Sequence, residues 1–398
     1  MYKWPLASDS FSIWDRIKIA LFVLNKNNQL TMGKRVEEFE NLMSKKYGVK
    51  ALAVSSGSAA NHLIFELYKQ LNPEKFKNSL VICPVVTWIS SVSPALMAGY
   101  NIKFCDVNLD DFCFDYQKLE NILKKNKDKN CIIWPTALIG NSPDFNKLQA
   151  LSLLYNAELW GDFCENQFSN YHWKSIFSQV SISSLSMYFS HMCTSIEMGF
   201  IFFAHEKDYE YAKMLRNHGL TRSLNNSSKL KEEIESKYSH IDKQFLFANL
   251  GTNWRPTDMH AIWGLQDIKR ADKYKEHRKK IYKYFYQQMA NESLLDKYYL
   301  PDYDHFDFSH QEYIAFCLAI FRKDNKIKKV KETLNKNGIS TRPIIGSCIT
   351  LQPPFVKYHN KKDFKNGLWI HNHGCYVGLL NNLKFSDIDR LINILKSI

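Results

Sequence analysis

Between residues 51 and 163, the sequence alternates short apolar runs with segments whose apolar residues recur at helical spacing. The apolar runs predict strands at 80–86, 102–107, 131–138 and 158–163, and the segments between them predict helices at 90–98, 116–125 and 145–155. Strands and helices that alternate at this spacing pack as a mostly parallel sheet with helices on both faces. The sequence therefore predicts an α/β protein whose ligands bind at the carboxyl ends of the strands.

The rest of the chain is predicted to extend this large domain and to add a smaller one. Residues 1–32 have no clear periodicity and are expected to form an irregular arm, residues 222–245 form a polar excursion, and a long helix is expected to reach about Met289. A strand at 312–321, a helix at 326–337 and a closing helix at 385–398 follow, which predicts a smaller α+β domain. We expect an arm and large domain at 1–260, and a linking helix and small domain at 261–398.

Charge and composition exclude several classes of protein. The formal net charge is +13, but the lysines are dispersed over amphipathic helices and no nucleic-acid-binding signature accompanies them. The longest purely apolar run is too short to cross a membrane. Nine cysteines are present without a C-x-C or C-x-x-C pair. We therefore expect a cytoplasmic protein without a metal site, a nucleic-acid partner or a membrane anchor.

Small polar residues follow the first apolar run. Residues 51–55 are expected to form a strand, and Ser56-Gly57-Ser58 comes directly before the next helix. A helix N-terminus presents unpaired N–H groups with partial positive charge, and glycine lets an anion approach closely. The pattern indicates an anion site, although a plain helix cap would explain it as well. Trp88, Asp162 and residues 186–191 also fall at predicted strand ends, as a shared site would require.

The segment 186–199, SMYFSHMCTSIEMG, resembles the cofactor-lysine segment of sugar aminotransferases that use pyridoxal 5'-phosphate (PLP), the DegT/DnrJ type. In that family a serine is followed five residues later by the lysine that carries PLP, but here the fifth residue after Ser186 is His191. No lysine occurs between Lys174 and Lys207. The segment is most similar to that of the 3-dehydratases of GDP-4-keto-6-deoxymannose, which have this histidine. The resemblance implies a fold-type I, aspartate aminotransferase-like enzyme that holds PLP without a covalent bond.

The resemblance also implies roles for individual residues. The cofactor-binding residues are expected to be Gly57 and Ser58 at the phosphate, Trp88 stacked on the ring, Asp162 at the pyridinium nitrogen, Glu165 near the ring hydroxyl, Ser186 at the phosphate, and Asn253. The family's counterpart of Asn253 reaches the phosphate from the partner subunit, which implies a homodimer with shared active sites. Substrate contacts are expected from Arg216, His218, Arg255 and Arg342.

For the reaction, the resemblance implies that L-glutamate converts PLP to pyridoxamine 5'-phosphate (PMP). PMP then reacts with the C4 ketone of a GDP-linked 4-keto-6-deoxy sugar. His191 removes a proton from the cofactor's C4' carbon, and the C3 hydroxyl leaves. The products are a 3,6-dideoxy-4-keto sugar, ammonia and 2-oxoglutarate, for surface polysaccharide synthesis.

Two departures from the family pattern stand out. Met198 replaces the first glycine of the usual Glu-Gly-Gly, and Ser347-Cys348 replaces a common Gly-Asn, which suggests a different sugar such as a heptose. Three other functions stay open. One is a CDP-4-keto-6-deoxyglucose 3-dehydrase, whose iron–sulfur cluster needs a C-x-C pair that this chain lacks. The others are a sugar 4-aminotransferase and a non-catalytic binding protein with an aminotransferase fold.

Overall fold

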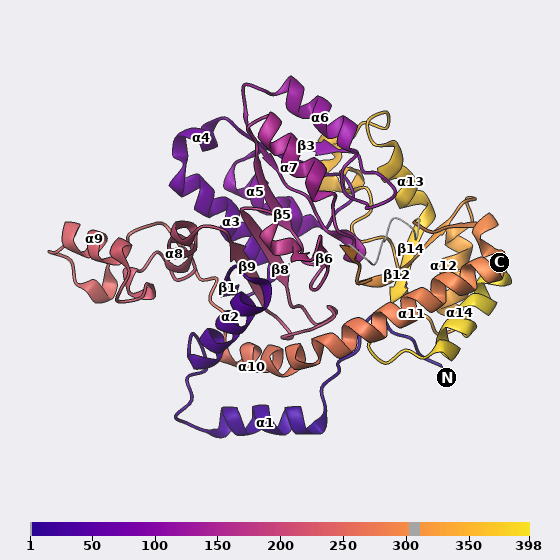
Figure 1. Cartoon of the computed structure of the whole chain (residues 1–398), viewed down its shortest axis with the longest axis horizontal. Helices are drawn as coiled ribbons and strands as arrows, with labels where there is room; N and C mark the ends of the chain where they lie inside the picture. The colour runs from indigo at the N-terminus through magenta and orange to yellow at the C-terminus, as the bar shows by residue number, and fades with distance from the viewer. Residues whose placement is uncertain (1, 302–310) are drawn as a thin grey trace.

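A computed structural model of the chain describes residues 2–301 and 311–398, and its centre is a seven-stranded sheet (Figure 1). The strand order is β1-β9-β8-β5-β4-β2-β3. These strands are β1 (Lys50–Val54), β9 (Gly199–Phe203), β8 (Ile182–Ser186), β5 (Glu158–Asp162), β4 (Asn130–Ile133), β2 (Ser79–Pro84) and β3 (Asn101–Cys105). Only β9 runs antiparallel to its neighbours in this sheet. The predicted mostly parallel sheet is confirmed.

Helices cover both faces of this sheet, each with its own apolar core. Side chains from α2 (Lys34–Tyr47), α6 (Tyr116–Lys125), α7 (Phe145–Leu154) and α10 (Asp258–Asp267) pack into one core. Side chains from α3 (Gly57–Leu71), α5 (Ser93–Ala98) and α8 (Glu206–Leu215) pack into the other. The short helix α4 (Pro73–Lys77) follows α3. Because both faces are covered, the strands are apolar along their length, as the sequence pattern indicated.

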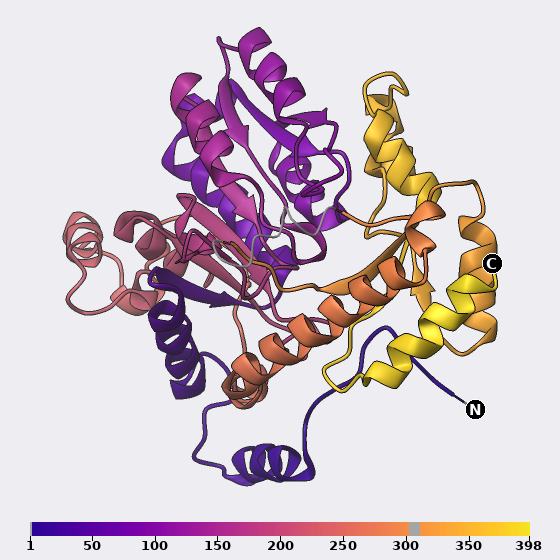
Figure 2. The ribbon, with the colours of Figure 1, turned by 45° about the vertical axis from the view of Figure 1, so that its right-hand side comes forward.

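A second, antiparallel sheet of four strands has the order β10-β12-β14-β13. Its strands are β10 (Tyr298–Tyr299), β12 (Cys317–Arg322), β14 (Gly374–Gly378) and β13 (Thr341–Arg342), and its helices are α12 (Ile327–Lys336), α13 (Lys365–His373) and α14 (Phe385–Lys396). The long helix α11 (Ala271–Asn291) runs from the large sheet to this smaller one (Figure 2). A third sheet has three short strands in the order β11-β6-β7. They are β11 (Gln311–Glu312), β6 (Asn170–Tyr171) and β7 (Lys174–Ser175).

The structure corrects four expectations about single elements. The arm contains the helix α1 (Ile13–Leu24), which Ser12 and Asp15 cap through a reciprocal capping box. The excursion at 222–245 contains α9 (Lys229–Lys237). The long helix is interrupted by a 3-10 turn at 268–270, so that α10 and α11 are separate, and the strand expected at 312–321 begins at Cys317.

The division predicted at residue 260 stays a prediction, but the start of the arm does not lie in the large domain. Trp4 packs into the apolar core of the smaller sheet. Among residues 2–301 and 311–398, no helix is long and apolar enough to cross a membrane.

Candidate active site

The N-terminus of α3 forms a polar cradle with the end of β8. Ser56 caps the helix, its Oγ accepting a hydrogen bond from the N–H of Ala59 at 3.1 Å. A Cβ atom on Gly57 would lie 2.7 Å from the Cβ of Ser186, so only glycine fits there. Ser58 is the next residue of the helix and is exposed. The N–H groups of the first helical turn therefore lie beside the Ser186 hydroxyl, an arrangement that suits a phosphate.

Gly199 explains how the chain tolerates Met198. Gly199 pairs with both Val54 and Ser186 across the sheet, and a Cβ atom on it would lie 2.4 Å from the carbonyl of Ser56. The side chain of Met198 instead packs in the apolar core. The cradle thus requires a glycine at 199 but not at 198, and the departure from the family pattern leaves it intact.

Asp162 is a buried carboxylate at the end of β5. Its Oδ2 accepts hydrogen bonds from Asn61 Nδ2 at 2.8 Å and Ser91 Oγ at 2.7 Å, and its Oδ1 accepts one from the N–H of Cys164 at 3.1 Å. No lysine or arginine pairs with it among the described residues. A buried carboxylate held by neutral donors alone is suited to pair with a cationic ligand group such as a pyridinium N–H.

Trp88 follows β2 and leads into the network around Asp162. The side chain of Trp88 is 53% exposed, and its carbonyl accepts a hydrogen bond from the N–H of Ser91 at 3.1 Å. Ser91 in turn donates to Asp162. Because its ring is not packed into either core, Trp88 remains available to stack on a ligand.

Glu165 lies three residues beyond Asp162 and supports a strained turn. Its Oε2 accepts a hydrogen bond from the N–H of Ile139 at 2.9 Å, and Ile139 has a left-handed backbone with φ 50°. A β-branched residue rarely adopts this conformation. Burial raises the pKa of the Glu165 carboxyl to about 8, with a smaller contribution from the charge of Asp162.

We predict that this raised pKa makes Glu165 destabilising as the pH rises above the ordinary pKa of a carboxyl. The folded protein keeps the carboxyl protonated up to about pH 8, whereas the unfolded chain ionises it near its ordinary pKa of 4.5. Stability therefore falls as the pH rises between these values. In Glu165→Gln this loss is absent, so the Tm of the variant relative to wild type should increase from about pH 5 to pH 8. The same difference measured for Glu74→Gln, an exposed residue, should stay flat.

His191 lies five residues beyond the end of β8. Both ring nitrogens, Nδ1 and Nε2, are buried, and neither pairs with another side chain among the described residues; the polar contacts of the ring are with the backbone of Cys164 and Tyr188. The ring meets Phe316 edge-on, with ring centroids 5.3 Å apart. Burial, together with the charge of Arg278, lowers the pKa of the imidazole to about 4. His191 is therefore neutral at physiological pH and can accept a proton.

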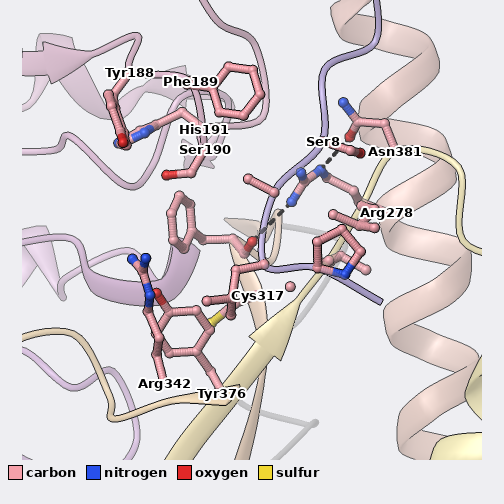
Figure 3. A pocket seen from close by; sticks show the side chains of 17 residues that line it. Ser8, Tyr188, Phe189, Ser190, His191, Arg278, Cys317, Arg342, Tyr376 and Asn381 are labelled. Atoms are coloured by element: carbon pink, nitrogen blue, oxygen red, sulfur yellow. Dashed lines mark hydrogen bonds between the residues drawn. The ribbon is translucent and has the colours of Figure 1, made fainter. Parts of the chain in front are cut away.

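His191 lines a cavity of about 220 Å³ together with Arg342, one of the predicted substrate residues (Figure 3). The cavity also contains Arg278 of α11, whose Nε donates to Asn381 and whose Nη1 donates to the carbonyls of Ala315 and Phe316. None of the described residues that line the cavity is acidic. Two guanidinium groups without a carboxylate favour an anionic ligand.

Three predicted residues lie together at a different place. Arg255 donates through Nη1 to Asn217 Oδ1 at 2.7 Å and through its N–H to Asn253 Oδ1 at 3.2 Å, and the N–H of His218 donates to the carbonyl of Thr252. None of Asn253, Arg255 and His218 is among the residues that line the His191 cavity. The chain therefore brings Gly57, Asp162 and Ser186 into one cluster and His191 and Arg342 into one cavity. It holds Asn253, Arg255 and His218 as a separate group.

The expectation that Arg216 contacts substrate is corrected. Arg216 is 2% exposed and forms a buried ion pair with Glu40, while its Nη1 also donates to the carbonyl of Ala53 at 2.7 Å. A guanidinium that is committed to a buried carboxylate is a structural group, because freeing it would leave Glu40 unpaired. Sequence reasoning missed Arg278, Asn61 and Ser91, of which only Asn61 lies close to a recognised motif, three residues after Ser58.

The α/β fold with its helix-terminus cradle, buried strand-end carboxylate and basic cavity fits the class of aminotransferase-like proteins, whose solved structures superpose on it. The sequence profile of the DegT/DnrJ/EryC1/StrS aminotransferase family matches residues 15–396, and the chain belongs to that family. The predicted family is thus confirmed.

Several known proteins are similar to this chain, two of them over its full length. GDP-4-keto-6-deoxy-D-mannose 3-dehydratase of Escherichia coli O55:H7 is 28% identical over 406 aligned positions, which cover 100% of both chains. The protein of the same name from Yersinia pseudotuberculosis is 25% identical and covers 100% of this chain and 99% of its own length. A UDP-4-amino-4,6-dideoxy-N-acetyl-beta-L-altrosamine transaminase of Campylobacter jejuni is 26% identical over 279 residues, or 70% of this chain and 68% of the relative.

The solved structures confirm the fold. An E. coli GDP-4-keto-6-deoxy-D-mannose-3-dehydratase with bound hydrated PLP superposes with a TM-score of 0.87 at 24% identity, covering 99% of this chain and 100% of the other. An aminotransferase of pseudaminic acid biosynthesis from Helicobacter pylori superposes with a TM-score of 0.84 at 17% identity, covering 100% and 99%. The predicted aspartate aminotransferase-like architecture is therefore correct.

Proposed function

We propose that this protein is a PLP- and L-glutamate-dependent 3-dehydratase of a GDP-linked 4-keto-6-deoxy sugar. The observation that carries the proposal is His191, a buried imidazole that pairs with no other side chain among the described residues and lies in the segment where aminotransferases of the family have their lysine. An imidazole cannot form a Schiff base with an aldehyde, whereas it can move protons. The two relatives reported above that align over 99% or more of both chains are named as 3-dehydratases of this kind.

The cradle residues fit the proposed cofactor. Gly57, Ser58 and Ser186 would hold its phosphate, Asp162 would pair with its ring N–H, and Trp88 would stack on its ring. Glu165, protonated below about pH 8, would donate a hydrogen bond to an oxygen of the ring. When bound, the cofactor supplies an electron sink that lets a neighbouring C–H bond ionise and a hydroxyl group depart.

The protein's own part in the reaction is to move protons within a closed pocket. Because the pKa of its imidazole is lowered to about 4, His191 is neutral at physiological pH. It can therefore accept the proton of the C–H bond that is broken. The same imidazole, once protonated, can return a proton to the departing oxygen at C3. Arg342 and Arg278 provide positive charge for the carboxylates of L-glutamate or the diphosphate of the sugar nucleotide.

The experiment that tests this function is ammonia release. The purified protein is incubated with PLP, excess L-glutamate and GDP-4-keto-6-deoxymannose, and with the CDP-linked hexose and a GDP-linked heptose for comparison. We expect ammonia with a GDP-linked sugar and none with the CDP-linked one. No ammonia with any of these sugars would refute a dehydratase of a GDP-linked 4-keto-6-deoxy sugar. The cofactor spectrum with glutamate alone would then show whether the protein is non-catalytic or acts on another sugar.

We further propose that the protein is a homodimer with shared active sites. Helix α1 contacts α10 through Ile19 and Phe22, but its outer face exposes large apolar side chains. Trp14 is 70% exposed and Leu24 is 78% exposed. An apolar face of this kind fits a second copy of the chain, since it is costly in water. The group of Asn253, Arg255 and His218, which is separate from the cavity, would then serve the partner's site.

This proposal predicts the oligomeric state of charged variants. In the double variant Trp14→Asp and Leu21→Asp, carboxylates on the outer face of α1 would be buried in the interface, so the dimer should dissociate. We expect a monomer by sedimentation equilibrium at micromolar concentration and a loss of ammonia release. Lys124→Asp on α6, an exposed position on another face, should leave the dimer unchanged. A fully dimeric double variant would place the interface elsewhere.

A further inference from the structure

Trp4, near the start of the chain, packs against the smaller sheet and forms hydrogen bonds with its surroundings. Trp4 is 1% exposed, and its Nε1 donates to the carbonyl of Gly378 at 2.7 Å. The N–H of Trp4 donates to the carbonyl of Gly338, and its own carbonyl accepts from the N–H of Ser340 at 2.9 Å. Trp4 is therefore fixed by its ring and by its backbone.

Two glycines leave room for this arm. A Cβ atom on Gly338 would lie 2.1 Å from the carbonyl oxygen of Tyr2, and a Cβ atom on Gly378 would lie 2.4 Å from that of Leu6. Each glycine thus allows an approach of backbone to backbone that no other residue permits. The close contact continues up to Leu6, where the arm leaves the sheet.

The next part of the arm forms a wall of the His191 cavity. Pro5, Leu6, Ala7 and Ser8 line the cavity, and Figure 3 shows the violet ribbon of the arm passing between the His191 segment and α11. The chain then reaches Asn381, between β14 and α14, whose Nδ2 donates to Ser10 Oγ and to the carbonyl of Met192, the residue after His191. Phe11 packs against Trp263, with ring centroids 4.4 Å apart. The arm therefore passes along the cavity from the smaller sheet to α10.

We propose that Trp4 is a positioning residue for His191: by anchoring the arm, it holds residues 5–8 as the wall that keeps water from the imidazole. This inference rests on the proposed function in one respect, namely that His191 acts as a base. The wall itself follows from the contacts of the arm. No side chain of the arm needs to touch the substrate for this role.

The wall matters because burial is the main reason that the imidazole stays neutral. Burial is the largest cause of the lowered pKa of His191, and the charge of Arg278 is the second. The other titratable groups that line the cavity are Arg342 on β13, Tyr376 on β14, Cys317 on β12 and Tyr188 on the His191 segment itself. If water entered, it would solvate the imidazolium and screen Arg278, and both effects raise the pKa of His191 toward its ordinary value of 6.5.

Two variants loosen the arm in independent ways. Trp4→Phe keeps an aromatic ring but removes the N–H bond to Gly378, and Gly378→Ala keeps Trp4 but displaces Leu6. Tyr2→Phe is the matched control, because it removes only the hydrogen bond of the hydroxyl to Asp387, away from the cavity. The full-length protein is labelled with ¹³Cε1-histidine, and the His191 signal is assigned by its absence in His191→Gln.

We expect the NMR titration midpoint of His191 to rise by at least about one pH unit in Trp4→Phe and Gly378→Ala, and to stay unchanged in Tyr2→Phe. The acidic limb of ammonia release should move by the same amount. Unchanged midpoints in both arm variants, with folding checked by thermal unfolding, would overturn the proposal. If Trp4→Phe does not fold, Gly378→Ala decides alone. Shifted midpoints in a protein that releases no ammonia would support the role of residues 5–8 and reject the proposed function. A failure of this inference can therefore be told apart from a failure of the proposed function.

Discussion

Replacing His191 with glutamine is expected to lower the rate of ammonia release by about 10²–10⁴-fold, the usual contribution of a positioned general base. Glutamine has a similar size, so that it should fill the space beside Phe316, but it cannot accept and return a proton near neutral pH. The imidazole pairs with no other side chain among the described residues, and its polar contacts are with the backbone of Cys164 and Tyr188 alone, so the fold should lose little. The effect should therefore appear in the rate and not in stability.

Two measurements accompany this variant. The cofactor should remain bound after dialysis, because the cradle of Gly57 and Ser186 is unchanged. The control is His205→Gln, an exposed histidine before α8 whose side chain does not cap the helix. A His191→Gln protein with wild-type ammonia release would remove His191 from the mechanism.

Replacing Asp162 with asparagine is expected to release the cofactor. The carboxylate is buried and is held by Asn61, Ser91 and the N–H of Cys164, so its charge is directed to the site and is not neutralised by another side chain. Losing one partner of a buried charge pair costs about 3–5 kcal/mol, and 3 kcal/mol is a factor of roughly 10² in affinity. We therefore expect PLP to dissociate on dialysis from Asp162→Asn but not from wild type.

A matched variant separates this effect from a loss of stability. Asp106, just after β3, is also a buried strand-end carboxylate, but it pairs with Lys118 and accepts from the N–H groups of Asn366 and Gly367. Asp106→Asn should lower Tm and retain the cofactor, whereas Asp162→Asn should lose the cofactor by equilibrium dialysis even where it remains folded. Equal retention of PLP by both variants would contradict the role of Asp162.

The sequence predicted those parts of the fold and the site that depend on local patterns. The buried parallel strands are apolar along their whole length, and Gly57, Asp162 and Ser186 each lie directly at a strand or helix end. For this reason the order of strands and helices along the chain was enough to predict that these three residues lie close together. The α1 helix was missed because its apolar residues surround the helix and do not form one stripe, although the capping box of Ser12 and Asp15 was a local signal.

Contacts between distant residues could not be predicted in this way. Arg216 reads like any surface arginine, and only its approach to Glu40, far away in the sequence, shows that it is buried. Arg278 lies in a lysine-rich amphipathic helix, where the sequence does not distinguish it from its exposed neighbours. The anchoring of Trp4 to Gly378 joins the two ends of the chain. Such pairs are set by tertiary packing, which single-sequence patterns do not encode.

The most direct test of the central claim is the fate of nitrogen. The claim is that His191, in place of a lysine, directs the chemistry to removal of an oxygen and not to transfer of an amine. The protein is incubated with PLP, ¹⁵N-labelled L-glutamate and a GDP-linked 4-keto-6-deoxy sugar, and both products are analysed by mass. Our account predicts ¹⁵N in free ammonia and a sugar that has lost one oxygen and carries no label. A sugar that retains its C3 oxygen and carries ¹⁵N at C4 would contradict it and make the protein an aminotransferase.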